Sequence, residues 1–153
     1  MLRNDHRAVE KLFKAFEKAK DSGTKSQAVS QMIPELSVHT VIEEEVFYPA
    51  IRREVEGADD MVLESLEEHH ILKWVLAELE GMPTEDERFE AKVTVLIENV
   101  RHHVEEEEQD MFPQVREALG RKRLGELGQQ MEELKARAPK RPQPRQEAGR
   151  AAS

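Results

Sequence analysis

The chain has no cysteine, and aromatic residues make up only 5% of its 153 residues. The absence of cysteine excludes disulfides, thiolate metal ligands, iron–sulfur clusters and a cysteine nucleophile. No apolar run approaches the roughly 18 residues that a membrane-spanning helix needs. The first ten residues, MLRNDHRAVE, also lack the apolar core of a signal peptide. We therefore expect a cytoplasmic protein without a membrane partner.

The chain has little excess of positive charge anywhere but at its C-terminal end, because 32 acidic residues outnumber 23 basic ones and the net charge is −9. The segment 137–153, RAPKRPQPRQEAGRAAS, holds five basic residues and one acid, so the residues before it carry −13. Nucleic-acid-binding modules usually present a basic face, so this acidity argues against a nucleic-acid partner. The segment 137–153 has no large apolar residue to offset its ordering entropy. It is predicted to be a disordered tail after one domain over residues 1–136.

Apolar residues recur at helical spacing, and no stretch alternates with the period of two that is typical of strands. The apolar stripes cover residues 2–16, 36–55, 61–79, 93–115 and 124–134. Short breaks between the first four stripes favour antiparallel neighbours. The sequence therefore predicts an all-α, up-down-up-down four-helix bundle with a short extra C-terminal helix. Thr84 and Glu87 resemble a capping box that opens the fourth helix, and Gly120 resembles a C-cap before the fifth.

Three prolines, Pro34, Pro49 and Pro113, lie inside helical patterns, and each is expected to distort or end its helix. Two of them mark a repeat, because HTVIEEEVFYP ends at Pro49 and HVEEEEQDMFP ends at Pro113. The segment DHRAVEKLF near the N-terminus aligns in the same way with EHHILKWVL. The chain is therefore predicted to consist of two similar helix pairs, roughly 1–56 and 64–118.

One histidine lies on each of the four long apolar stripes, and two of these histidines have a glutamate four residues later. The six residues are His6, His39, Glu43, His69, His103 and Glu107. A histidine and a glutamate at this spacing project from one helix face about 6 Å apart. Burying a lone carboxylate costs several kcal/mol unless it is paired or bound to a metal. Imidazole and carboxylate without sulfur suit iron, manganese or zinc, and this number of groups suits two ions better than one.

Each of these signals is weak alone. A single histidine on an apolar face is usually a hydrogen-bonded core residue, and chance produces His-x-x-x-Glu in glutamate-rich helices. The conjunction of four inward histidines, two glutamates and a repeat favours a metal centre over a metal-free helical interaction protein. The other acids of these runs are expected to be solvated, namely Glu44, Glu45, Glu105, Glu106 and Glu108.

Four motifs together resemble those of the hemerythrin-like, HHE cation-binding family of bacterial proteins: DHRAVEKLF, LSVHTVIEEEVFYPAI, EEHHILKW and VRHHVEEEEQDMFPQV. The resemblance covers about residues 1–136. It implies a four-helix bundle around a non-haem di-iron centre with bridging carboxylates. It also implies that the metal ligands are His6, His39, Glu43, His69, His103 and Glu107.

The sequence departs from the oxygen-carrying members of that family, whose third helix supplies two histidines four residues apart. Here Lys73 stands four residues after His69. The implied ligand set of four histidines and two glutamates leaves room for solvent or another ligand. His70 or His102 could substitute for the missing imidazole, or could orient a ligand or carry protons.

The resemblance implies two iron ions, although manganese or zinc would fit the same groups. It implies a small partner such as dioxygen, nitric oxide or peroxide, or a response to iron. A catalase-like, peroxidase-like or oxidase enzyme at the same centre is the alternative, and the sequence shows no catalytic residue that decides between binding and turnover. The residues expected to line the ligand's path are Leu36, Leu66, Leu72, Leu96 and Val100.

Overall fold

The computed structural model describes residues 1–143, and no strand occurs among them. The helices are α1 (Leu2–Lys18), α2 (Ser22–Ile42), α3 (Tyr48–Glu54), α4 (Asp59–Leu79), α5 (Phe89–Glu106) and α6 (Phe112–Lys135). Two π-helical turns, η1 (Glu43–Phe47) and η2 (Glu107–Met111), join α2 to α3 and α5 to α6. No helix within the described range is both long and apolar enough to cross a membrane.

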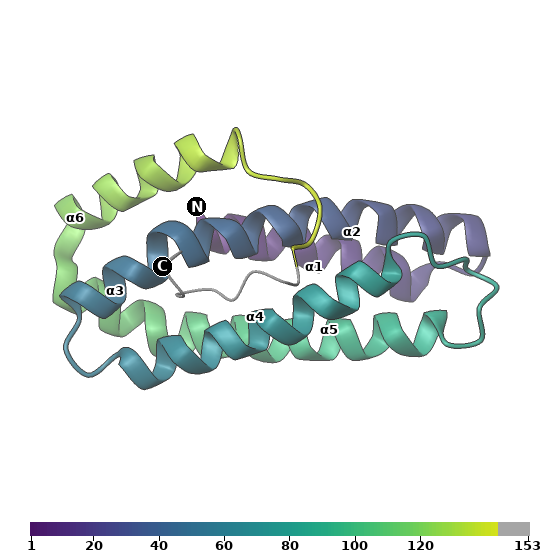
Figure 1. Ribbon diagram of the computed structural model, residues 1–153, viewed down its shortest axis with the longest axis horizontal. Helices are drawn as coiled ribbons and strands as arrows, with labels where there is room; N and C mark the ends of the chain where they lie inside the picture. Colours follow the sequence, from purple (N-terminus) through teal and green to yellow (C-terminus); the bar gives the residue numbers. More distant parts are fainter. Residues whose placement is uncertain (144–153) are drawn as a thin grey trace.

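The helices form four antiparallel rods (Figure 1). The first rod is α1, and the second is α2, η1 and α3 in one line. The third is α4, and the fourth is α5, η2 and the first part of α6. The helix α1 packs against α2, and α4 packs against α5. The predicted up-down-up-down four-helix bundle is confirmed.

The helix α6 changes direction at Gly120, whose φ of 76° and ψ of 172° are not helical. Side chains with a Cβ rarely adopt this conformation. Beyond Gly120 the chain runs back over the bundle (Figure 1) and buries Leu127, Met131 and Leu134. The predicted extra helix and its boundary at Gly120 are therefore confirmed.

The Gly120→Ala substitution is expected to lower the free energy of unfolding by about 1–3 kcal/mol, because alanine is strained in this conformation. Gly125→Ala is the matched control, since Gly125 lies in the helical part of α6 with no atom within 4 Å of an added Cβ. It should raise stability by about 0.5–1 kcal/mol. Urea denaturation of both variants measures the difference, and equal effects would contradict a special role for Gly120.

The prolines differ in their effect on the helices. Pro49 and Pro113 each follow a π turn, in which the Tyr48 and Phe112 N–H groups donate to the carbonyls five residues earlier. The wider turn accommodates a ring that would clash with the carbonyl four residues earlier in an α-helix. The expectation for Pro34 was wrong, because α2 continues through it to Ile42. Met32 and Leu36, both buried on either side of Pro34, hold the helix by packing.

The predicted capping box at Thr84 and Glu87 is also wrong, because α5 begins later, at Phe89. The Asp86 N–H donates to the Pro83 carbonyl, so Thr84 lies inside a turn. The Asp86 side chain accepts a hydrogen bond from the Arg88 N–H at 2.9 Å. A proline-initiated turn therefore takes the place of the expected helix start.

The apolar core consists of two clusters. One contains Phe13, Met32, Leu76, Leu96 and their neighbours, and the other contains Ile42, Ile51, Val62, Met111, Leu127 and their neighbours. The six predicted metal ligands belong to neither, although all six are buried. The bundle thus holds a polar layer with an apolar cluster on each side along its length.

The predicted disordered tail covers residues 137–153, and residues 144–153 lie outside the described chain. Within the described part, Ala138 is buried and Arg141 pairs with Glu80 at the end of α4.

Candidate metal centre

The structure brings all six predicted ligands together in the polar layer. His6 comes from α1, His39 from α2, His69 from α4 and His103 from α5. Glu43 and Glu107 are the first residues of the two π turns. Helix periodicity turns each of these side chains inward, and every one of them is at most 6% exposed. Four separate rods therefore contribute to one buried group.

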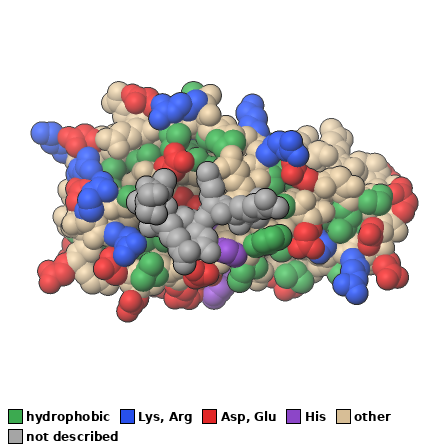
Figure 2. Space-filling view, viewed as in Figure 1, with side chains coloured by type: hydrophobic (Ala, Val, Ile, Leu, Met, Phe, Trp, Pro, Cys, Tyr) green, Lys and Arg blue, Asp and Glu red, His purple; other side chains and the backbone are tan. Residues whose placement is uncertain are grey.

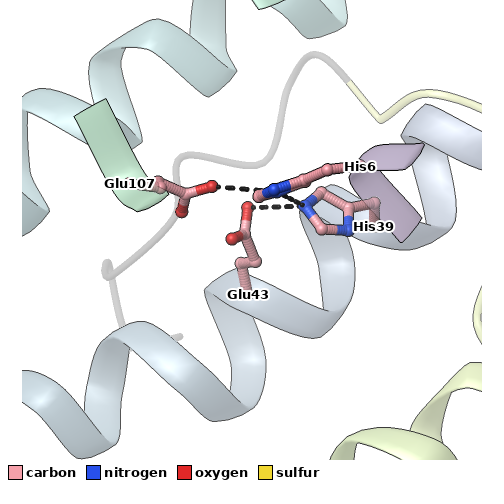
Figure 3. A group of neighbouring side chains, drawn as sticks. All are labelled: His6, His39, Glu43 and Glu107. Atoms are coloured by element: carbon pink, nitrogen blue, oxygen red, sulfur yellow. Dashed lines mark hydrogen bonds and ion pairs between the residues drawn. The ribbon is translucent and has the colours of Figure 1, made fainter. Parts of the chain in front are cut away.

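His6 and His39 form the first imidazole pair (Figure 3). Their Nε2 atoms lie 3.2 Å apart. Glu107 Oε1 is 3.2 Å from Nε2 of His6, and Glu43 Oε1 is 3.3 Å from Nε2 of His39. Each of these four residues offers one ligand atom, and the four atoms lie within 4.8 Å of one another, close enough to hold a single ion.

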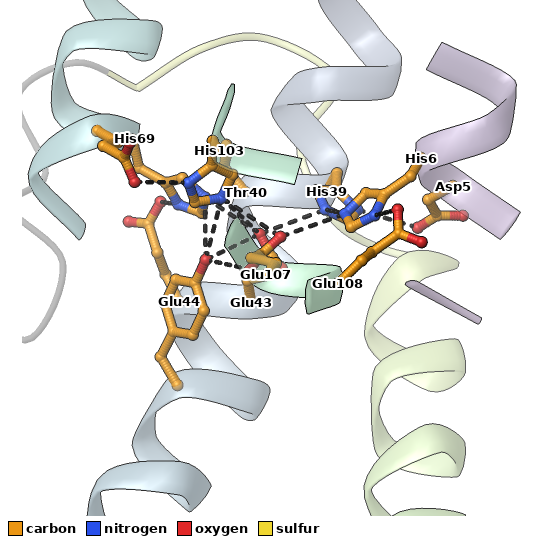
Figure 4. A network of polar contacts seen from close by, with 12 residues as sticks. Asp5, His6, His39, Thr40, Glu43, Glu44, His69, His103, Glu107 and Glu108 are labelled. Atoms are coloured by element: carbon orange, nitrogen blue, oxygen red, sulfur yellow. Dashed lines mark hydrogen bonds and ion pairs between the residues drawn. The ribbon is translucent and has the colours of Figure 1, made fainter. Parts of the chain in front are cut away.

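His69 and His103 form the second pair, whose Nε2 atoms are also 3.2 Å apart. Glu43 Oε1 lies 3.1 Å from Nε2 of His69, and Glu107 Oε1 lies 3.4 Å from Nε2 of His103. Glu43 Oε1 also lies 3.8 Å from Nε2 of His103, so each glutamate contacts both pairs. Figure 4 shows the two glutamates between the two histidine pairs, which is the position that a bridging carboxylate would need.

Each of the four imidazoles also faces a carboxylate with its outer nitrogen, Nδ1. The partners are Glu108 for His6 (3.1 Å), Asp5 for His39 (3.3 Å), Glu44 for His69 (2.9 Å) and Glu68 for His103 (2.9 Å). An ionised carboxylate only accepts hydrogen bonds, so Nδ1 carries the proton and the Nε2 lone pair points inward.

Sequence reasoning missed these four outer carboxylates. Glu44 and Glu108 were expected to be solvated, yet the Glu44 side chain is only 8% exposed. A signal was present, because an acid precedes both His6 and His69, and an acid follows both Glu43 and Glu107. The repetition of these acids in both halves of the chain marks them as part of the centre.

The donor set fits a metal. Four Nε2 lone pairs cannot satisfy one another by hydrogen bonding, since each outer nitrogen already holds the proton. Glu43 Oε2 and Glu107 Oε1 are buried and receive no hydrogen bond. Buried anionic oxygens without donors are costly, and a cation among them removes that cost. Nitrogen and oxygen donors without sulfur suit iron, manganese or zinc.

The pKa values of His39 and Glu43 also indicate that the buried carboxylates attract positive charge. Burial disfavours the imidazolium form, but Glu43, Asp5 and Glu107 outweigh it and raise the pKa of His39 to about 10. Burial also opposes the Glu43 carboxylate, but His39 and His103 hold its pKa well below the usual value. Without a metal, protons supply the cations that these carboxylates attract.

Tyr48 is a further member of the centre that sequence reasoning missed. Its hydroxyl donates to Glu107 Oε2 at 2.6 Å and lies 3.4 Å and 3.3 Å from Nε2 of His69 and His103. Burial and the two glutamates raise the pKa of Tyr48 well above its usual value, so the phenol keeps its proton. The equivalent residue in the second half, Phe112, stacks on His6. The exchange of phenylalanine for tyrosine in one repeat was the available signal.

The remaining predicted residues lie outside this group. His70 accepts a hydrogen bond from the Trp74 indole at 3.2 Å. His102 is exposed, and its Nε2 lies 3.0 Å from Glu106 Oε1. Lys73 occupies the position at which oxygen carriers would have another histidine, and it is buried and pairs with Glu44. Because Glu44 also holds His69, Lys73 supports an imidazole through that carboxylate.

A cavity of about 240 Å³ reaches the centre and is lined by all four inward histidines. Of the expected lining residues, Leu36, Leu72 and Val100 line it. Leu66 and Leu96 are not among the residues that line it. A largely apolar cavity of this size admits a small neutral molecule beside the histidines.

Comparisons with known proteins agree with this architecture. The chain is 29% identical over 110 residues to an uncharacterised hemerythrin-like protein of Schizosaccharomyces pombe, which covers 71% of this chain and 54% of that protein. It is 28% identical over 119 residues to a DNA nickase of Nostoc, covering 78% of this chain and 33% of that protein. The chain thus spans about half of the first relative and a third of the second.

The fold is similar to the crystal structure of a hemerythrin HHE cation-binding domain-containing protein from Mycobacterium kansasii. The TM-score is 0.71 at 22% identity, over 88% of this chain and 85% of that one. The sequence model of the hemerythrin HHE cation-binding domain matches residues 1–115. These residues include every helix that contributes to the polar layer, and the chain belongs to the hemerythrin HHE cation-binding domain family.

Proposed function

We propose that the protein holds two iron ions in the polar layer and binds or responds to a small ligand such as dioxygen, nitric oxide or peroxide. The observation that carries this proposal is the arrangement of the four buried imidazoles in two pairs. Both glutamates contact both pairs. One ion would take His6 and His39, the other would take His69 and His103, and Glu43 and Glu107 would bridge them.

Iron held by these residues would supply binding of a small ligand and one-electron redox chemistry. The protein supplies the rest. The four outer carboxylates fix the imidazole tautomer and the direction of each lone pair. The apolar part of the cavity disfavours water along the ligand's path, and the Tyr48 hydroxyl, which donates to Glu107 Oε2, lies beside the second histidine pair.

The test is metal content per chain after anaerobic loading with ferrous iron, with an optical spectrum before and after exposure to air. Two irons per chain and a new near-ultraviolet band on air exposure are expected. Parallel loading with manganese and zinc measures metal preference. Retention of no metal, or of a single ion, would contradict the two-iron proposal, and a metal-free helical bundle would remain.

The enzyme alternative is tested on the same iron-loaded protein. Addition of peroxide in large excess separates a binding protein from a catalase-like one, because a binding protein reacts in proportion to its iron. Sustained evolution of oxygen would move the assignment to an enzyme at the same centre.

A further inference from the structure

A second group of metal-ligating side chains lies outside the buried centre. Glu68 of α4 and His102 and Glu106 of α5 present one ligand atom each within 4.8 Å of one another. His102 and Glu106 are four residues apart on one helix face, and their side chains are 65% and 38% exposed. Figure 2 shows histidine side chains at the surface among acidic and apolar ones. One imidazole with two carboxylates suits a divalent cation that keeps part of its water.

This outer group is continuous with the buried centre. Glu68 Oε1 accepts the hydrogen bond from His103 Nδ1 at 2.9 Å, so one carboxylate belongs to both. The cavity that is lined by the four inward histidines is also lined by Glu68 and His102. An ion at the outer group would therefore stand at the outer end of the space that leads to the imidazoles.

The first half of the chain has no equivalent group. The positions that correspond to His102 and Glu106 are Val38 and Ile42, and Ile42 is completely buried. The counterpart of Glu68 is Asp5, which pairs with Lys135 of the extra helix at 2.8 Å. Both halves of the chain therefore contain the inner histidines and glutamate, but only the second half contains the outer group of Glu68, His102 and Glu106.

We propose that Glu68, His102 and Glu106 form an entry site that captures a divalent metal ion from solution and passes it along the cavity to the buried centre. This proposal rests on the metal centre proposed above and assigns His102 and Glu106 to its loading rather than to its final coordination. A negative, partly hydrated site at the mouth of a low-dielectric cavity raises the local concentration of cations there.

The proposal is tested by the rate of ferrous iron uptake under anaerobic conditions. Rapid mixing of metal-free protein with ferrous iron, followed by quenching with a chelator at set times, measures the iron that has reached the buried centre. The His102→Ala and Glu106→Gln variants are expected to load about tenfold more slowly. Their final iron content should equal that of the unchanged protein. A titration with Zn²⁺ should also lose one weak binding equivalent in each variant.

Glu105→Gln is the matched control, because it removes the same charge from the residue of α5 that precedes Glu106 and lies outside the group. It should load at the unchanged rate. Equal loading rates in all three variants and the unchanged protein would overturn the entry site while leaving the two-iron proposal intact. Failure of the unchanged protein to take up iron would overturn both proposals. A lower final iron content in His102→Ala would place His102 among the permanent ligands and contradict the entry role.

Discussion

The double substitution His39→Ala, His103→Ala is expected to abolish stable iron binding. Each alanine removes one imidazole from one of the two pairs, because His39 faces His6 and His103 faces His69. Losing only a supporting residue near a metal typically lowers its affinity about 10- to 100-fold. Losing a direct ligand from both positions should lower it further. Iron content per chain after gel filtration measures the effect.

The double substitution His70→Ala, His102→Ala is the matched control. It removes two imidazoles from the facing helices α4 and α5, but neither contacts the polar layer. After prolonged incubation its iron content should equal that of the unchanged protein. Full iron content in the His39→Ala, His103→Ala protein would sink the ligand assignment, whatever the control shows. Circular dichroism of both proteins separates metal loss from unfolding.

Helical periodicity and the internal repeat were sufficient to find the six buried residues that we propose as ligands. His6, His39, His69 and His103 occupy apolar stripes, and a polar residue on such a stripe must lie in the core. The i, i+4 spacing placed Glu43 on the face of His39. These inferences needed only the 100° step of an α-helix, which holds up to the π turns.

The π turns explain why Tyr48 was missed. Tyr48 is five residues after Glu43, and five α-helical steps would place it about 140° away from that carboxylate. In η1 the Tyr48 N–H instead bonds to the Glu43 carbonyl, which brings positions five apart onto one face. The Tyr48 hydroxyl then reaches Glu43 Oε1 at 3.2 Å. Pro49 and Pro113 follow such turns, whereas Pro34 lies inside α2, so a proline in a helical pattern does not by itself predict a π turn.

The outer carboxylates were missed for a different reason. Periodicity predicts which face of a helix a residue occupies, but it does not predict which of several adjacent glutamates bends toward a histidine on a neighbouring helix. Glu44 does so, whereas Glu45 is exposed. Only the position of His69 on α4 beside η1 separates the two. The repeat is therefore the better guide to the supporting residues, because Asp5 and Glu68 keep their place relative to the following histidine.

Removal of the metal is expected to lower the melting temperature by about 10 °C or more without unfolding the bundle. A ligand that binds only the folded state stabilises it by about 4 kcal/mol at a thousandfold excess over its dissociation constant. For a chain of roughly 150 residues, each kcal/mol shifts the melting temperature by about 2–4 °C. Thermal denaturation of iron-loaded protein, before and after treatment with a chelator, measures the shift.

The bundle should survive because protons replace the metal in part, and its melting temperature should fall because that replacement is incomplete. The raised pKa of His39 and the lowered pKa of Glu43 mean that imidazolium–carboxylate pairs form in the metal-free centre. The apolar clusters on both sides of the polar layer remain packed. The His39→Ala, His103→Ala protein should then melt at the same temperature with and without iron. The loaded and chelated forms of the unchanged protein could instead melt at equal temperatures. That result would mean that protons offset the cost of burying the two glutamates as well as iron does, and it would contradict a stabilising role for the metal.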